Sequence, residues 1–281
     1  MIRVTSEMLP DVRAYLERHA EFVMFPLTNL ATYGLDGTAP RAPQFWVNEG
    51  PLQDVLCMTT EGMVMPFLPS GDVSAAAQMV RASGAVIGMI GPAASVRPLQ
   101  SALGLAHAPA TMNEDEPQFM LALDDLIIPE GEGALIPLAD APEDLIRDWM
   151  ADYQRNALHT PEPKITDLVE MDYRNRCATG SHMVLVIDGV CVAKTGFNAQ
   201  LPDIVQIGGV YTPPCLRGRG YARRAVALHL AQARAAGVTR ATLFSASDMA
   251  ARAYMAIGFE RIGDWTLMLF DGHQHSEGRG A

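Results

Sequence analysis

A strand that runs into a glycine-rich turn and then into a helix is the feature that most constrains the fold of this chain. The segment DIVQIGGVYT, residues 203–212, is a predicted strand with Gly208 and Gly209 in its middle. The turn PPCLRGRG follows it, and an alanine-rich helix is expected from about Gly220 to Ala236. Gly237 is a suitable residue to end that helix. With the elements around it, this unit predicts an α/β fold.

The turn has the chemistry of an anion site. The first N–H groups of a helix lack intrahelical partners, and the helix dipole favours negative charge there by about 0.3–1 kcal/mol. Gly218 and Gly220 let the backbone approach a ligand closely. Arg217, Arg219 and Arg223 can add charge-assisted hydrogen bonds. We therefore expect the turn to bind a phosphate.

Two common phosphate motifs are excluded. No Gly-Lys-Ser/Thr ends the turn, so it is not a Walker A loop. It is not G-x-G-x-x-G either, because Arg223 stands where the third glycine belongs. The sequence therefore disfavours a dinucleotide-binding fold.

Bulk composition limits the function further. The 281 residues are 49% hydrophobic, enough for one or two domains with real cores. No apolar run reaches the roughly 18 residues that span a bilayer, and charged residues among the first twenty exclude a signal peptide. A net charge of -11 argues against general nucleic-acid binding. Four cysteines without a CxxC pair favour a reducing compartment, so we expect a cytoplasmic protein.

The C-terminal half of the chain has a clear pattern of elements. An Asp188-Gly189 pair between two β-branched runs predicts a hairpin with a type I′ turn. Two adjacent glycines inside a strand predict a bulge at Gly208-Gly209. The expected strands are 134–138, 183–187, 190–197, 203–212, 241–247 and 261–270, and the expected helices begin near 142, 168, 220 and 248.

The N-terminal half has weaker patterns. Its order of elements loosely resembles that of the C-terminal half, without a repeat at the level of residues. The expected helices are 10–18, 20–33 and 73–82, the expected strands are 44–48, 54–59, 63–68 and 119–128, and 85–95 is expected to be strand, turn and helix.

Two motifs in order resemble the GNAT N-acetyltransferase superfamily. VYTPPCLRGRGYARRAV is similar to its acyl-CoA-binding segment, Q/R-x-x-G-x-G/A, with Arg217, Gly220 and Ala222 at the defined positions. SDMAARAYMAIGFE is similar to its N-x-x-A-x-x-x-Y-x-x-x-G-F. There Ala250, Tyr254, Gly258 and Phe259 fit, and Ser247 replaces the asparagine. The paired motifs cover about 203–260, and the element order extends the resemblance to about 134–270.

The resemblance implies acetyl-CoA as co-substrate and no metal. The pyrophosphate would lie on the amides of Arg217–Ala222, and the pantetheine along the preceding strand. The backbone N–H of Val210 would polarise the thioester carbonyl, and Tyr254 would protonate the leaving thiolate; these are the expected catalytic residues. The expected cofactor-binding residues are Val210, Tyr211, Thr212, Arg217, Gly218, Arg219, Gly220, Tyr221, Ala222, Arg223, Ser247 and Tyr254.

The implied reaction is direct transfer of an acetyl group, within a ternary complex, to a primary amine of a small molecule or an amino terminus. No general base is evident, since the pantetheine strand offers only Gln206 and Tyr211, so a water relay is expected. Two alternatives stay open. One is a non-catalytic acyl-CoA-binding sensor, and the other is transfer of an aminoacyl or longer acyl group.

The resemblance also implies two tandem domains of GNAT fold, each a mixed twisted sheet flanked by helices. Residues 1–133 contain no R-x-x-G-x-G, and GMIGPAASVRPL, residues 88–99, is the nearest strand, turn and helix. We expect a degenerate N-terminal copy at 1–130, a catalytic domain at 134–270 and a disordered tail at 271–281. Acceptor residues are expected in 152–176, after Phe197 and at the domain seam. The protein is expected to bind no nucleic acid or membrane and to be a monomer or homodimer.

Several residues have simpler interpretations. Ser247 fits a helix N-cap as well as a cofactor contact. Cys215 is expected to be a bystander in the turn. Contact of His159 and His182 with substrate is the alternative to the expectation that each is structural or solvent-facing. His273 and His275 form an HxH without a third ligand, so no metal site is expected there.

Overall fold

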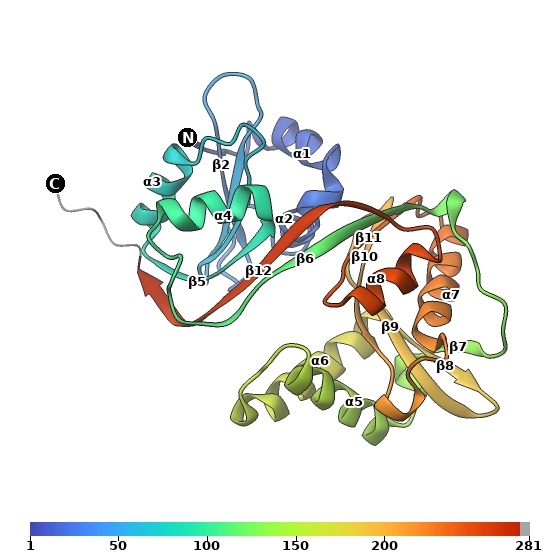
Figure 1. The fold of residues 1–281 in the computed structure, drawn as a ribbon. Helices are drawn as coiled ribbons and strands as arrows, with labels where there is room; N and C mark the ends of the chain where they lie inside the picture. The colour runs from blue at the N-terminus through green and yellow to red at the C-terminus, as the bar shows by residue number, and fades with distance from the viewer. Residues whose placement is uncertain (276–281) are drawn as a thin grey trace. The chain divides into compact units, whose positions relative to one another are not determined.

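The computed structural model describes residues 1–275, which form two compact units (Figure 1). Unit 1 comprises Met1–Glu116 and the described residues from Gly263 onward, and unit 2 comprises Pro117–Ile262. Two long strands, β6 (Ala110–Ala122) and β12 (Glu260–His275), have residues in both units.

Unit 2 contains most of the elements predicted for the C-terminal half. The Asp188-Gly189 turn has φ of 49° and 77°, which confirms the predicted type I′ hairpin. The strands are β7 (Ala134–Pro137), β8 (His182–Ile187), β9 (Val190–Gln200), β10 (Ile204–Tyr211) and β11 (Arg240–Phe244). The helices are α5 (Glu143–Asn156), α6 (Glu162–Thr179), α7 (Tyr221–Ala235) and α8 (Asp248–Met255), with 3-10 turns at Leu123–Asp125, Leu138–Asp140 and Pro214–Leu216.

The sheet of unit 2 is mixed, as expected for the predicted fold. Its strand order is β6-β11-β10-β9-β8-β7, and only β10 and β11 run parallel among these neighbours. A parallel pair needs a crossover connection, and α7 provides it.

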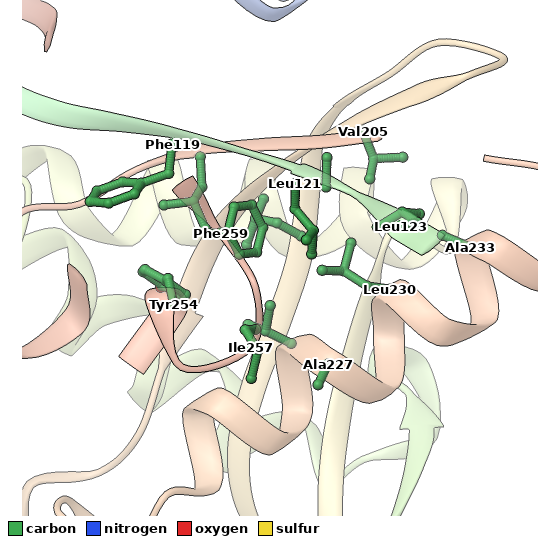
Figure 2. Close-up of a cluster of buried hydrophobic side chains, with 14 of the residues drawn as sticks. Phe119, Leu121, Leu123, Val205, Ala227, Leu230, Ala233, Tyr254, Ile257 and Phe259 are labelled. Carbon is green, nitrogen blue, oxygen red and sulfur yellow. The ribbon is translucent and has the colours of Figure 1, made fainter. Parts of the chain in front are cut away.

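The main core of unit 2 packs α7 and α8 onto the sheet (Figure 2). Leu230 on α7 and Leu121 on β6 are fully or almost fully buried there, because apolar positions of the helix recur on the side that faces the strands. A second cluster packs α5 and α6 against the other side of the sheet (Figure 1). Ile146, Trp149 and Met150, spaced as predicted for a helix, are its buried positions on α5.

Unit 1 repeats the element order of unit 2. The order β1-α1-α2-β2-β3-β4-α3-β5-α4-β6 recurs as β7-α5-α6-β8-β9-β10-α7-β11-α8-β12. In each unit one parallel pair of strands follows three antiparallel pairs. The further elements of unit 1 are β1 (Ile2–Arg3), α1 (Leu9–Glu17), α2 (Ala20–Tyr33), β2 (Pro43–Val47), β3 (Val55–Thr59), β4 (Met63–Phe67), α3 (Ser74–Ser83), β5 (Ala85–Pro92) and α4 (Ala93–Ala102).

The final strands of the two repeats explain why the units differ in extent from the predicted segments 1–130 and 134–270. The end of β6 pairs with β11 of unit 2, in register Arg240↔Ala122. The far part of β12 pairs with β5 of unit 1, in register Trp265↔Pro92. The first five strands of each repeat are therefore followed in the sheet by the last strand of the other repeat: β6 pairs with β11, and β12 pairs with β5.

Two predictions near the ends of these strands were wrong. Residues 271–275 belong to β12 instead of a disordered tail, and the Asp271 N–H donates to the Pro109 carbonyl at 2.9 Å. The remaining residues of that predicted tail, 276–281, lie outside the described residues. The strand predicted at 119–128 ends at Ala122, where a 3-10 turn begins. Among the described residues, no helix is long and apolar enough to cross a membrane.

Candidate functional site

The strand β10 separates from its parallel neighbour β11 halfway along its length. The two strands pair at Ile204↔Arg240, Val205↔Ala241 and Gln206↔Thr242, and the pairing stops there. Residues Ile207–Tyr211 continue as strand beyond that point. Their backbone groups on the β11 side therefore need another partner, and an extended ligand can supply one.

The predicted bulge lies on this separated part of β10. Gly208 pairs with Gly196 and Tyr211 with Lys194, so Gly209 and Val210 both lie opposite Thr195 alone. A Cβ on Gly208 would stand 1.8 Å from the Asn198 amide nitrogen, and Gly209 has a φ of 60°. Both positions therefore require glycine, which confirms the prediction of a bulge.

The turn before α7 presents unbonded backbone amides. Gly220 is the N-cap with φ of 79°, and no side chain caps it. The first intrahelical bond runs from the Arg224 N–H to the Gly220 carbonyl, at 3.0 Å. The N–H groups of Gly220 to Arg223 therefore lack an intrahelical partner. The turn is exposed, so these amides are available to an anion.

The four arginines in the turn and the first turn of α7 make different contacts. Arg224 donates to the carbonyls of Glu132 (2.8 Å) and Pro129 (2.5 Å), which fixes the connecting segment against α7. Arg217 donates to the Thr212 carbonyl at 3.0 Å, and Arg219 is exposed. The buried Nε of Arg223 has no hydrogen-bond partner. Within residues 1–275, no ion pair engages Arg217, Arg219 or Arg223.

The second motif forms α8 and the strand after it. The Ser247 hydroxyl accepts a hydrogen bond from the Ala250 N–H at 3.2 Å, so Ser247 is the N-cap of α8, as one of its two predicted interpretations required. Tyr254 is 9% exposed and packs edge-on against Phe259 in the main core (Figure 2). Its role as an acid stays a prediction.

Tyr211 faces the helices α5 and α6. Its ring packs against Trp149, and its hydroxyl donates to Asp152 at 2.7 Å. Burial first, and then the bond to Asp152, raises the pKa of Tyr211 well above its usual value. Asp152 lies in the stretch 152–176 where acceptor residues are expected, which connects that stretch to the end of β10.

A buried group of basic residues lies beside the bulge, and the sequence patterns did not predict it. His182 is 2% exposed and Lys194 is 0% exposed, so the solvent-facing alternative for His182 was wrong. Lys194 was not singled out, although it is one of just two lysines in the chain and interrupts the apolar run VCVAKTGF. A lysine at an inward position of a predicted central strand was the available signal.

The remaining candidates are one cysteine and three histidines, and none has an assigned role in the site. Cys215 is exposed on the 3-10 turn Pro214–Leu216, and His159 has a positive φ of 50° in the loop between α5 and α6. His273 and His275 lie on β12, and the described part of the chain contains no group of three residues suited to hold a metal.

The turn of unit 1 that corresponds to Arg217–Gly220 lies between β4 and α3, at 68–73. The segment GMIGPAASVRPL, compared with it in the sequence analysis, instead spans β5 and α4, the counterparts of β11 and α8. In the β4–α3 turn, Asp54 accepts from the Ser70 N–H (3.0 Å) and hydroxyl (2.5 Å). Asp72 accepts from the Ser74 N–H at 2.9 Å. Carboxylates of the chain itself therefore accept from Ser70 and Ser74 in this region.

Comparisons with known proteins agree with this geometry. Residues 143–259 match the family described as Acetyltransferase (GNAT) family. No curated protein matches the chain. Among solved structures, a GNAT-family acetyltransferase from Colwellia psychrerythraea has 13% identity and a TM-score of 0.51, covering 95% of this chain and 98% of its own. A GCN5-related N-acetyltransferase from Kribbella flavida has 21% identity and a TM-score of 0.52, covering 78% and 87%.

A third solved structure resembles both units. It is a tandem GNAT protein from the clavulanic acid biosynthesis pathway, with 14% identity and a TM-score of 0.53, and it covers 95% of this chain and 96% of its own. At such identities these structures establish the fold alone. With the family match, they show a GNAT acetyltransferase domain at residues 143–259 and the GNAT fold, a mixed sheet flanked by helices.

Proposed function

We propose that the protein is an acetyl-CoA-dependent N-acetyltransferase that acts on a primary amine by direct transfer in a ternary complex. The observation that carries the proposal is the separation of β10 from β11 after Gln206, directly before a turn of unbonded amides. An extended thiol arm and a diphosphate need these two features in this order.

The residues of the site fit such a co-substrate. The amides of Gly220 to Arg223 and the side chains of Arg217, Arg219 and Arg223 bind the diphosphate. The β11-facing edge of Ile207–Tyr211 pairs with the pantetheine arm. Bound acetyl-CoA supplies a thioester whose carbonyl carbon the amine attacks.

Two groups of the chain assist the transfer. The Val210 N–H donates to the carbonyl oxygen, which becomes an oxyanion when the amine adds. Tyr254 donates its hydroxyl proton to the departing thiolate, and the proton lost by the amine leaves through water. A fixed N–H donor of this type stabilises an oxyanion by about 2.7–4 kcal/mol.

Unit 1 is proposed to be a degenerate copy without a cofactor. Asp54 and Asp72 already accept from its turn, and the Leu68 N–H donates to the Ser95 hydroxyl at 2.9 Å, next to the end of β4. A diphosphate would meet two carboxylates there instead of three arginines.

The test measures binding and turnover separately. Titration calorimetry with acetyl-CoA should give a defined affinity, and a panel of primary amines should release free thiol. Tyr254→Phe should lower kcat by about a hundredfold with acetyl-CoA affinity kept, because only the proton donor is lost. Tyr33→Phe, at an exposed tyrosine of unit 1, is the matched control. Equal turnover of Tyr254→Phe and wild type would remove the acid role.

A non-catalytic acyl-CoA sensor is the second candidate. It is favoured by the burial of Tyr254 and by the use of Ser247 as a helix cap. A sensor would bind acetyl-CoA and release no thiol with any amine, whereas an enzyme would turn over.

A further inference from the structure

Three basic side chains converge on the bulge of β10. The point where a Cβ on Gly209 would stand lies 3.1 Å from His182 Nε2, 3.2 Å from Arg176 Nη1 and 3.5 Å from Lys194 Nζ. The three residues come from β8, α6 and β9. Three separate elements thus direct nitrogen atoms at one short stretch of backbone.

The local structure fixes the imidazole in this position. His182 pairs across the sheet with Gly196, and a Cβ on Gly196 would stand 2.2 Å from Nε2, so only glycine leaves room for the ring. On the other side of the ring, Nδ1 lies 2.9 Å from the Ser181 hydroxyl. The ring is therefore held at Nδ1, and Nε2 is turned toward β10.

Two of the three nitrogens that point at the bulge lack a hydrogen bond. His182 Nε2 and Lys194 Nζ are buried and have no hydrogen-bond partner, and Nζ instead lies 5.8 Å from the centre of the Tyr153 ring. Arg176 pairs with Asp172 at 3.1 Å. Buried polar atoms in folded proteins are almost always paired, so two unpaired nitrogens at one point indicate a place for a ligand.

The charges around the group favour an anion there. Burial, and then the charge of Arg176, holds the pKa of Lys194 well below its usual value, with Asp172 acting in the opposite direction. Burial, Arg176, Lys194 and His229 likewise lower the pKa of His182. A bound anion would reverse both effects and draw protons onto the two side chains.

The position of the group beside Val210 points to the acceptor substrate. The nitrogens of this cluster can form charge-assisted hydrogen bonds with a carboxylate, because a bound anion favours the protonated forms of Lys194 and His182. We propose that Arg176, His182 and Lys194 bind the carboxylate of the acceptor, so that the substrate is an α-amino acid or another amine with a carboxylate close by. This inference rests on the proposed acetyl transfer and names its acceptor class.

Steady-state kinetics on the full chain provide the test. The probes are the proteinogenic α-amino acids and their primary amides, which differ in the carboxylate alone. For the best acid, kcat/KM should exceed that of its amide by about a hundredfold, because the amide leaves the buried nitrogens without an anionic partner. Calorimetry of the N-acetyl-α-amino acids with the CoA complex, in two buffers of different ionisation enthalpy, should show proton uptake.

Matched variants locate the effect. Lys194→Met keeps the length of the side chain and removes its nitrogen, and His182→Asn is a second, independent variant. Both should raise KM for the acid about tenfold or more, reduce the acid-to-amide ratio and abolish part of the proton uptake, with acetyl-CoA affinity unchanged. Lys164→Met replaces the other lysine, which is exposed on α6, and should keep the wild-type ratio.

The outcomes separate this inference from the proposed function. Failure to bind acetyl-CoA in the absence of acceptor contradicts the proposed function itself. If acetyl-CoA binds and the amides react as well as the acids, or no acid reacts or binds, the carboxylate site is overturned. A fall in kcat for acids and amides alike, at constant KM, would also overturn it, because the cluster would then stabilise the oxyanion of the reaction.

Discussion

The two turns that follow the third strand of each repeat share a position and differ in chemistry. In unit 1, two N–H groups of the β4–α3 region, those of Ser70 and Ser74, donate to Asp54 and Asp72 of the chain itself. In unit 2, the β10–α7 turn leaves the N–H groups of Gly220 to Arg223 unbonded and surrounds them with arginines. Internal carboxylates thus accept from two N–H groups of this region in unit 1, whereas no side chain caps the first turn of α7 in unit 2.

The difference shows which property of the fold is general and which is specific. Element order and the parallel crossover are common to both units, because hydrophobic packing of helices on a sheet requires only apolar residues at the right spacing. The capacity to bind a diphosphate depends on a few polar residues at one turn. Loss of function in a repeat therefore needs little change in its core.

The largest effect is expected from the turn of unit 2. Arg217→Ala combined with Gly220→Ala should weaken acetyl-CoA binding by about a hundredfold, because it removes one cation and forces a Cβ into a φ of 79°. Calorimetry measures this. Gly71→Ala in the turn of unit 1 is the matched control, since Gly71 has a φ of 78° and open space around its Cβ position. Equal affinities for the double variant and wild type would break the comparison.

The carboxylate in the turn of unit 1 should affect stability and leave ligand binding unchanged. Asp54 is 7% exposed and accepts two hydrogen bonds from Ser70. Asp54→Ala should lower the free energy of unfolding of unit 1 by about 1–3 kcal/mol, because the two charge-assisted hydrogen bonds to the buried carboxylate are lost. Urea unfolding measures the loss, and acetyl-CoA titration should match wild type. A change in affinity would mean that unit 1 takes part in the site.

Replacement of the buried Lys194 should give the smallest effect, and it should stabilise the protein instead of destabilising it. Lys194→Met should raise the free energy of unfolding by about 1–2 kcal/mol near neutral pH, because a buried nitrogen without a hydrogen bond is removed. The pKa of Lys194 is lowered in the folded state, so below its usual value of 10.5 the unfolded chain binds a proton that the folded chain does not. Wild-type stability therefore rises as the pH approaches 10.5, and the advantage of the variant should shrink over that range.

Unfolding curves at several pH values check this prediction. Lys164→Met, at the exposed lysine, should show no such dependence. An advantage of Lys194→Met that is constant from neutral pH to about 10.5 would mean that Lys194 stays protonated in the folded protein.

Local signals in the sequence predicted much of unit 2. Asp188-Gly189 defined a turn whose φ angles the residues themselves favour, and Gly208-Gly209 defined a bulge. The paired motifs indicated the family that residues 143–259 match and the turn before α7. The exchange of β6 and β12 between the units could not be predicted in this way, because a strand's pattern of residues does not specify which distant strand it pairs with.

The sequence by itself determined most elements of unit 2, the glycine and arginine turn and the similarity of residues 143–259 to the GNAT family. Only the tertiary structure decided that His182, Lys194 and Arg176, from three elements, meet at Gly209. It also decided that Asp54 accepts a hydrogen bond from Ser70 in the turn of unit 1. Helices, turns and bulges follow from interactions between near neighbours in the chain. The environment of a buried charge depends on side chains that are distant in sequence, and folding alone brings them together.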